Sequence, residues 1–316
     1  MKLHEDTEAF AELVTAAATH IGLPEAYVEK DYWVTRALKH LSQSTHHDVA
    51  IFKGGTSLSK AYRLIDRFSE DIDLAIFAGD LSGGAKKRLL KNIEKVVARD
   101  LIEIKEDVRI SKGSNFRKTV YQYPRKADDE NFGQASTELL IEVNSFTNPE
   151  PFDERELQSF VAEMLRGTGK GELIEAYELQ SFPVQVLSVK RTLIEKILGV
   201  IKDSYNADPV ARLSLRIRHL YDICLILKQE EHRAFVAGDE FASLCKVCIE
   251  DERILFKDTA GLFDKPLAEA PIFSNFKEWR PSLEVTYSGA FKDLVYSDLP
   301  SMQDIDDTLA FIKEHL

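Results

Sequence analysis

The chain has 316 residues, of which 44% are hydrophobic and 30% charged, a composition typical of one large globular domain or two ordinary ones. Its formal net charge of −12 excludes a generally basic surface, so any contact with RNA or DNA must use a local patch. No apolar run approaches the roughly 20 residues that span a bilayer, and the first residues lack a signal-peptide pattern. We therefore expect a cytoplasmic protein.

The three cysteines, Cys224, Cys245 and Cys248, are too few and odd in number for a disulfide framework, which fits a reducing compartment. Cys245 and Cys248 form a CxxC motif, but its flanking residues are apolar and no second ligand pair lies nearby. Helix packing is therefore favoured over a zinc or redox site.

Apolar residues recur at helical spacing over 5–19 and over 24–42, which predicts two helices. In the second helix Asp31 shares a face with Tyr27 and Val34. We interpret Asp31 as an acid at the edge of the apolar stripe that pairs with a nearby cation.

The stretch from Ile51 to Phe77 contains the residues that we expect to form a binding site for a metal-bound nucleotide. A short apolar strand over 49–52 is followed by Gly54 and Gly55, and then by apolar residues at helical spacing as far as Phe68. Glycine lets the backbone approach a ligand closely, and the start of a helix favours phosphate. The pattern predicts a strand, a glycine turn and a helix.

Residues 71–77 alternate with a period of two, which places Asp71 and Asp73 on one face of a strand. A further strand over 138–146 carries Glu142 in its middle, where a charge is costly unless it is paired or bound to metal. Hard cations such as Mg²⁺ take one or two carboxylates together with phosphate oxygens and waters. The three acids therefore predict a site for Mg²⁺, or Mn²⁺, with a nucleoside triphosphate as substrate, in which two ions stabilise the attacking and leaving oxygens.

Two stretches are strongly basic. One is a predicted helix around residues 86–95. The other is the segment from Lys112 to Lys126, a predicted hairpin in which three aromatic residues are interleaved with five cations. The hairpin suits RNA, because cations track phosphate and rings stack on bases. It is equally consistent with an exposed hairpin that carries ordinary strand aromatics.

Downstream, the sequence predicts an amphipathic helix over 153–165 and a short strand or extended link over 182–187. Helical spacing then covers residues 188–201, 213–227, 233–251 and 304–315.

The run KGGTSLSKAYRLIDRFSEDIDLAI resembles the first motif of the AbiEii/AbiGii toxin family, nucleotidyltransferase-like toxins of abortive-infection and toxin–antitoxin systems to which the MenT toxins are related. The similarity extends to Lys30-Asp31-Tyr32, to the strand with Glu142, to VLSVKRTLIEKI and to RIRHLYDICLI. This resemblance implies an α+β fold. A polymerase-beta-like nucleotidyltransferase domain, a mixed sheet with helices, would occupy 1–180, a mostly helical domain 181–316, and the active site the cleft between them.

The resemblance also implies roles for individual residues. Asp71 and Asp73 match the metal-binding pair, and Glu142 matches a third carboxylate that would bind metal, act as general base, or do neither. The turn that faces phosphate would consist of Gly54, Gly55, Thr56 and Ser57.

Further residues are implied in the helical part. Lys196 matches the family's helical lysine, which would neutralise triphosphate charge with help from Lys60 or Arg67, and Asp222 matches a late aspartate. From spacing alone, Lys196 would instead be a surface cation paired with Glu195 or another acid, and Asp222 would pair with Arg218 one helical turn away.

The expected activity is that of a toxin that transfers a nucleoside monophosphate from a nucleoside triphosphate to an RNA acceptor such as a tRNA 3′ end. Two alternatives are transfer to a protein hydroxyl, and a protein that binds a nucleotide or a partner without turnover. The family further implies a cognate antitoxin encoded by a neighbouring gene.

Overall fold

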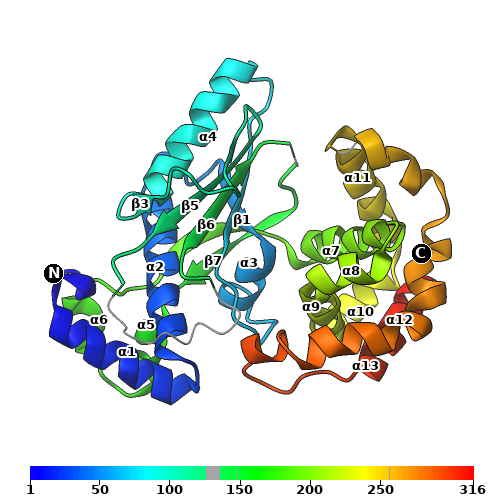
Figure 1. Ribbon diagram of the computed structural model, residues 1–316. Coiled ribbons are helices and arrows are strands. Elements are labelled where there is room, and N and C mark those ends of the chain that lie inside the picture. The colour runs from blue at the N-terminus through cyan, green and yellow to red at the C-terminus, as the bar shows by residue number, and fades with distance from the viewer. Residues whose placement is uncertain (126–135, 147, 256) are drawn as a thin grey trace. The chain divides into compact units, whose positions relative to one another are not determined.

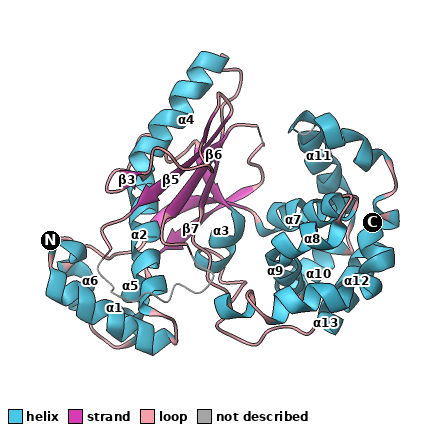
Figure 2. Ribbon diagram, viewed as in Figure 1, coloured by secondary structure: helices cyan, strands magenta, loops and turns pink. Residues whose placement is uncertain are grey.

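The computed structural model describes residues 1–125, 136–146, 148–255 and 257–316. The chain forms two compact units: the first comprises Met1–Arg63 and Phe68–Leu187, and the second comprises Leu64–Arg67 and Ser188–Leu316 (Figure 1). In the described residues all of the named strands belong to the first unit, whereas the regular elements of the second are helices (Figure 2).

An eight-stranded mixed sheet organises the first unit, with strand order β3-β5-β6-β2-β1-β8-β7 and β4 paired to β5. The pairs β2·β6 and β1·β8 are parallel and the others antiparallel. The strands are β1 (Ala50–Lys53), β2 (Ile72–Ile76), β3 (Ile102–Glu103), β4 (Ser111–Lys112), β5 (Phe116–Gln122), β6 (Leu139–Asn144), β7 (Phe152–Leu157) and β8 (Phe182–Leu187).

Helices pack around this sheet. The elements are a 3₁₀ turn (Leu3–Glu5), α1 (Thr7–Ile21), α2 (Glu25–Ser42), α3 (Gly54–Lys60), α4 (Gly83–Val97), α5 (Phe160–Gly167) and α6 (Gly171–Ala176). Helices α2 and α4 contact each other; α4 also contacts β5 and β6, and α2 contacts β8. The fold is therefore α+β, as the sequence predicts.

The second unit contains α7 (Val189–Ser204), α8 (Pro209–Leu215), α9 (Ile217–Leu227), α10 (Glu230–Val236), α11 (Asp239–Leu255), α12 (Pro271–Ser288) and α13 (Met302–Glu314), with 3₁₀ segments at Lys257–Asp264, Leu267–Glu269 and Lys292–Leu294. Cys245 and Cys248 are free and buried on α11, which confirms the packing interpretation of the CxxC motif. No helix in the described part of the chain is long and apolar enough to cross a membrane.

A buried polar cluster attaches α4 to the sheet. Glu94 is the one acid of α4, and its carboxylate accepts hydrogen bonds from Arg117 Nε and, at 2.8 Å, from the Tyr121 hydroxyl. Both donors lie on β5, on the face opposite Lys118. Because the three side chains are buried, their charges and dipoles must satisfy one another, and this fixes which side of α4 faces the sheet.

The helix predicted to continue to Phe68 ends at Lys60, so that part of the prediction is wrong. Arg63 adopts a left-handed backbone conformation with φ of 54°, which interrupts helical geometry. Arg67 then pairs through its backbone with Val295 in the second unit. Tertiary contacts thus draw residues 64–67 out of the helix that local spacing favours.

The predicted helix over 153–165 is also wrong in its first half. Residues Phe152–Leu157 form β7, which pairs along its length with β8, and only Phe160–Gly167 is helical. The charged side chains at 153–156 are exposed, as suits an edge strand, and Leu157 is buried. These residues form a strand instead of a helix because β8 supplies partners for their backbone hydrogen bonds.

Replacing Glu94 with alanine is expected to lower the free energy of unfolding by about 3 kcal/mol, because Arg117 would stay buried without a counter-charge. Urea denaturation measures the loss. The matched control is Glu106→Ala, which removes an exposed acid and should stay within about 0.5 kcal/mol of the wild type. Equal stability of the two variants would contradict the anchoring role of Glu94.

Candidate active site

Four charged residues form a row across the middle of the sheet. The strand register pairs Lys53 of β1 with Asp73 of β2, Asp73 with Glu142 of β6, and Glu142 with Lys118 of β5. Paired residues in neighbouring strands project from the same face, so two carboxylates lie side by side between two lysines. The opposite face carries Ile72, Leu74 and other buried apolar residues.

Asp71 and Asp73 have neither a hydrogen-bond nor an ion-pair partner within the described residues, and both are half-buried. Burial, together with the nearby carboxylates of Glu142 and Asp71, raises the pKa of the Asp73 carboxyl to about 7. Lys53 and Lys118 oppose it only in part. A cation bound here would offset the repulsion between the carboxylates and favour their ionised forms.

Gly54 lies directly against Asp73. Its φ is +84°, and a Cβ atom built on it would be closer to Asp73 Oδ2 than non-bonded atoms allow. Two neighbouring hydroxyls already have partners: Ser57 Oγ donates to the Gly54 carbonyl at 2.9 Å, and Thr56 Oγ1 lies 3.0 Å from Ser69 Oγ, outside the turn. The glycine turn predicted from the sequence therefore borders the acid pair, and its side-chain hydroxyls are engaged.

The donor set of Asp71 and Asp73 fits a divalent cation, because Mg²⁺ needs only one or two carboxylates and completes its shell with waters and phosphate oxygens. Glu142 is held differently, since its carboxylate pairs with Lys118 Nζ at 2.6 Å. Across the part of the chain that is described, no three His, Cys, Asp or Glu side chains gather closely enough to hold one ion together.

Lys60, which we expected near the triphosphate, instead forms an ion pair with Asp31. Both side chains are buried, and the second Asp31 oxygen accepts a hydrogen bond from the Phe160 backbone N–H at 2.7 Å. Asp31 is therefore the paired acid that its helical position predicts. The Lys60 ammonium is committed to this contact, and we correct its assignment to that of a residue that joins α2, α3 and α5.

In the second unit, Lys196 and Asp222 lie together with Arg67. Arg67 donates to both carboxylate oxygens of Asp222, at 2.7 and 2.8 Å, and Lys196 Nζ lies 2.7 Å from Oδ2. Neither the pairing of Asp222 with Arg218 nor a surface position for Lys196 is correct. Burial by itself would raise the pKa of Asp222, but the two cations outweigh it and hold that pKa below its usual value. Burial lowers the pKa of Lys196, against the effect of Asp222.

The basic and aromatic hairpin does not present the groups that RNA contact would need. Tyr121 and Tyr123 are buried, and Arg117 forms an ion pair with Glu94. The hairpin partner of β5 is the two-residue strand β4, and Lys126 lies outside the described residues. The interpretation as ordinary strand aromatics is therefore the better one.

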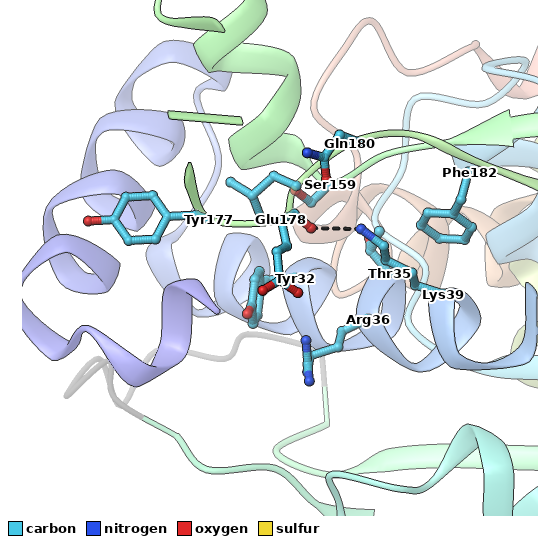
Figure 3. Close-up of a pocket in the computed structure, with 10 residues that line it drawn as sticks. Tyr32, Thr35, Arg36, Lys39, Ser159, Tyr177, Glu178, Gln180 and Phe182 are labelled. Carbon is cyan, nitrogen blue, oxygen red and sulfur yellow. Dashed lines mark hydrogen bonds between the residues drawn. The ribbon is translucent and has the colours of Figure 1, made fainter. Parts of the chain in front are cut away.

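A separate pocket lies in the first unit between α2 and the segment that leads into β8 (Figure 3). Lys39 crosses it, with Nζ 2.7 Å from the Glu178 carbonyl oxygen (Figure 3). The pocket's volume of about 30 Å³ is on the scale of a single water molecule. The pocket is too small for a nucleotide, and the described residues that line it include none of the predicted site residues.

Sequence reasoning missed Lys53 and Lys118 as members of the site. Lys53 directly precedes the glycine pair, and Lys118 is one of the hairpin cations, so each lies next to or within a motif that the sequence identifies. Their place beside the acids depends on strand order and register, which the local pattern does not specify.

A mixed sheet that presents two neighbouring acids beside a glycine turn is the arrangement expected of a nucleotidyltransferase. The family model described as "Nucleotidyl transferase AbiEii toxin, Type IV TA system" matches residues 36–310. The chain therefore belongs to the AbiEii family of nucleotidyltransferase toxins of type IV toxin–antitoxin systems, and an antitoxin partner follows from this membership.

Among solved structures, MenT4, a nucleotidyltransferase toxin from Mycobacterium tuberculosis H37Rv, is similar with a TM-score of 0.42 and 15% sequence identity. The match covers 86% of this chain and 98% of that chain. A comparison with curated protein sequences gave no match.

Gly54→Ala is expected to destabilise the first unit by more than about 1 kcal/mol, because alanine is strained at positive φ and its Cβ would displace the Asp73 carboxylate. Urea denaturation gives the stability, and binding of Mn²⁺ followed by electron paramagnetic resonance reports the acid pair. The control Gly84→Ala adds a methyl group to open space and should leave both readouts unchanged. Unchanged metal binding in folded Gly54→Ala protein would count against the proximity of this turn to the site.

Asp222 should also make stability depend on pH. Because its folded-state pKa is lowered, its contribution is present above the unfolded-state pKa, about 3.9, and is lost as pH falls through and below that value. We expect Asp222→Asn to cost about 3 kcal/mol near pH 7 and to flatten the loss of stability between about pH 5 and pH 2. Thermal unfolding across this range measures it, with Asp80→Asn as the exposed control. Parallel pH profiles for the wild type and Asp222→Asn would refute the assignment.

Proposed function

We propose that this toxin transfers a nucleoside monophosphate from a nucleoside triphosphate to an RNA acceptor, such as a tRNA 3′ end, with Mg²⁺ or Mn²⁺. The observation that carries the proposal is the pair Asp71 and Asp73, two adjacent acids on one strand face that lack a protein counter-ion among the described residues. In the reaction an RNA hydroxyl oxygen forms a bond to the α-phosphorus, the bond to the bridging oxygen breaks, and pyrophosphate leaves.

Asp71 and Asp73 are the residues that would hold the divalent ions. Such ions supply positive charge to the phosphoryl oxygens as charge builds up on them. The backbone of the turn at Gly54 faces the phosphates in this proposal, since Gly54 lies directly against Asp73. The first N–H groups of a helix have no intrahelical partner and suit phosphate oxygens.

Glu142 has two possible uses in this scheme. It would either join the metal ligands or accept the proton from the attacking hydroxyl, and in both cases its ion pair with Lys118 must exchange or loosen. Contact of Lys196 with the triphosphate stays a prediction from the family resemblance. Burial lowers the pKa of Lys196, while its ion pair with Asp222 favours the protonated form.

Incubation of the purified protein with each α-³²P-labelled nucleoside triphosphate, Mg²⁺ and total RNA is expected to give labelled RNA. Asp73→Asn should reduce labelling by a factor of about 100 or more, because it removes a ligand from the charge-stabilising site. Asp80→Asn is the matched control, since Asp80 is an exposed aspartate of the same unit, and it should label RNA like the wild type.

Other outcomes separate the alternatives. Labelled protein without labelled RNA would identify a protein hydroxyl as the acceptor. Binding of nucleotide and Mg²⁺ without release of pyrophosphate would identify a non-catalytic binding protein. Labelling that is unchanged in Asp73→Asn would reject the proposed site. A part in abortive infection is a further expectation that belongs to the same proposal.

A further inference from the structure

Helix α4 carries a row of unpaired cations on its outer side. Lys87, Arg88, Lys91 and Lys95 are exposed, and their side chains make no ion pair or hydrogen bond within the described residues. We call these four residues the basic face of α4. Elsewhere in the first unit many cations are paired with acids, as with Lys60, so this face departs from the pattern of its surroundings.

Helix geometry explains why the cations share one side. At about 100° per residue, the four basic residues fall within an arc of about 100°. The buried residues Leu90, Ile93, Glu94 and Val97 occupy the neighbouring arc, which faces the sheet. Because Glu94 is the one acid of the helix and is buried against β5, the basic face contains no negative charge.

This arrangement works against the stability of the helix. Lys87, Lys91 and Lys95 follow one another at i, i+4 spacing, where like charges disfavour a helix by about 0.2–0.5 kcal/mol per pair. The first turn contains no acid, although an acid there would favour the helix dipole. Among the described residues, no acid pairs with these cations to relieve this repulsion. A polyanionic ligand would relieve it instead.

We propose that the basic face of α4 binds the phosphate backbone of the RNA acceptor. This inference rests on the proposed function and names the surface that receives its substrate. Lys87, Lys91 and Lys95 lie about 6 Å apart along the helix axis, so successive ammonium groups can follow a strand of phosphates. Contacts of this kind are electrostatic and independent of base sequence.

Two other kinds of partner fit the face less well. Interfaces between proteins are depleted in lysine and enriched in aromatic residues, and α4 contains no aromatic residue. A helix that lies on a membrane needs a free apolar side, but Leu90, Ile93 and Val97 are buried. RNA is the occupant that requires only what the basic face offers.

The test compares the full-length chain with the variant Lys87→Gln/Lys91→Gln/Lys95→Gln, using a transcribed tRNA as probe in filter binding over a range of KCl concentrations. Loss of three phosphate contacts should weaken binding on the order of tenfold to a hundredfold near 0.1 M salt. It should also reduce the slope of log K against log salt by about 2. The control Lys170→Gln/Lys246→Gln/Lys313→Gln removes the same charge from exposed positions elsewhere and should change affinity less than twofold.

The outcomes distinguish this surface from the catalytic proposal. Asp73→Asn should bind tRNA like the wild type while its transfer activity falls by a factor of about 100 or more. The α4 variant should raise KM for tRNA with little change in kcat. If both triple variants bind tRNA equally, the surface is refuted while transfer activity can stand. If tRNA binds through α4 but no RNA is ever labelled, the proposed function fails and the surface stands. Binding by the wild type to vesicles of phosphatidylserine and phosphatidylcholine but not to tRNA would overturn the inference. Urea denaturation confirms folding, since fewer like charges should leave stability equal or higher.

Discussion

Like charges that lie side by side in the middle of a sheet are the constraint on which the first unit depends. The parallel register of β2 and β6 sets Asp73 beside Glu142, and Asp71 lies nearby at the start of β2. Such an arrangement costs free energy in the absence of a cation, because each carboxylate opposes ionisation of the other. The sheet must therefore be stabilised from its other face, where apolar side chains from β2 and β6 are fully buried against helices.

Buried ion pairs elsewhere follow a different rule, in which each charge has a partner. Lys60 meets Asp31, and Arg67 together with Lys196 meets Asp222. These pairs join segments that are distant in sequence but belong to the same unit. Each pair holds backbone elements in place, because removal of one partner would leave an uncompensated buried charge.

The acid pair and α4 have opposite electrostatic character within the first unit. Asp71 and Asp73 supply a place for positive charge from outside the protein, whereas α4 supplies positive charge of its own. Glu94 orients α4, since its bonds to Arg117 and Tyr121, on the face of the sheet opposite Lys118, turn the basic face of α4 outward. A chain with a strongly negative total charge can in this way keep one local surface suited to a polyanion.

Local pattern in the sequence was enough to identify the acid strand, the glycine turn and the helix that contains Asp31, because period and turn chemistry act over a few residues. The same information predicted helices through Phe68 and over 153–157, where backbone pairing with distant segments prevailed. Strand order, register and burial decided which charges meet. They turned Lys60 toward Asp31 and brought Lys53 and Lys118 to the acids. Such contacts join residues far apart in the chain, and only the packed structure determines them.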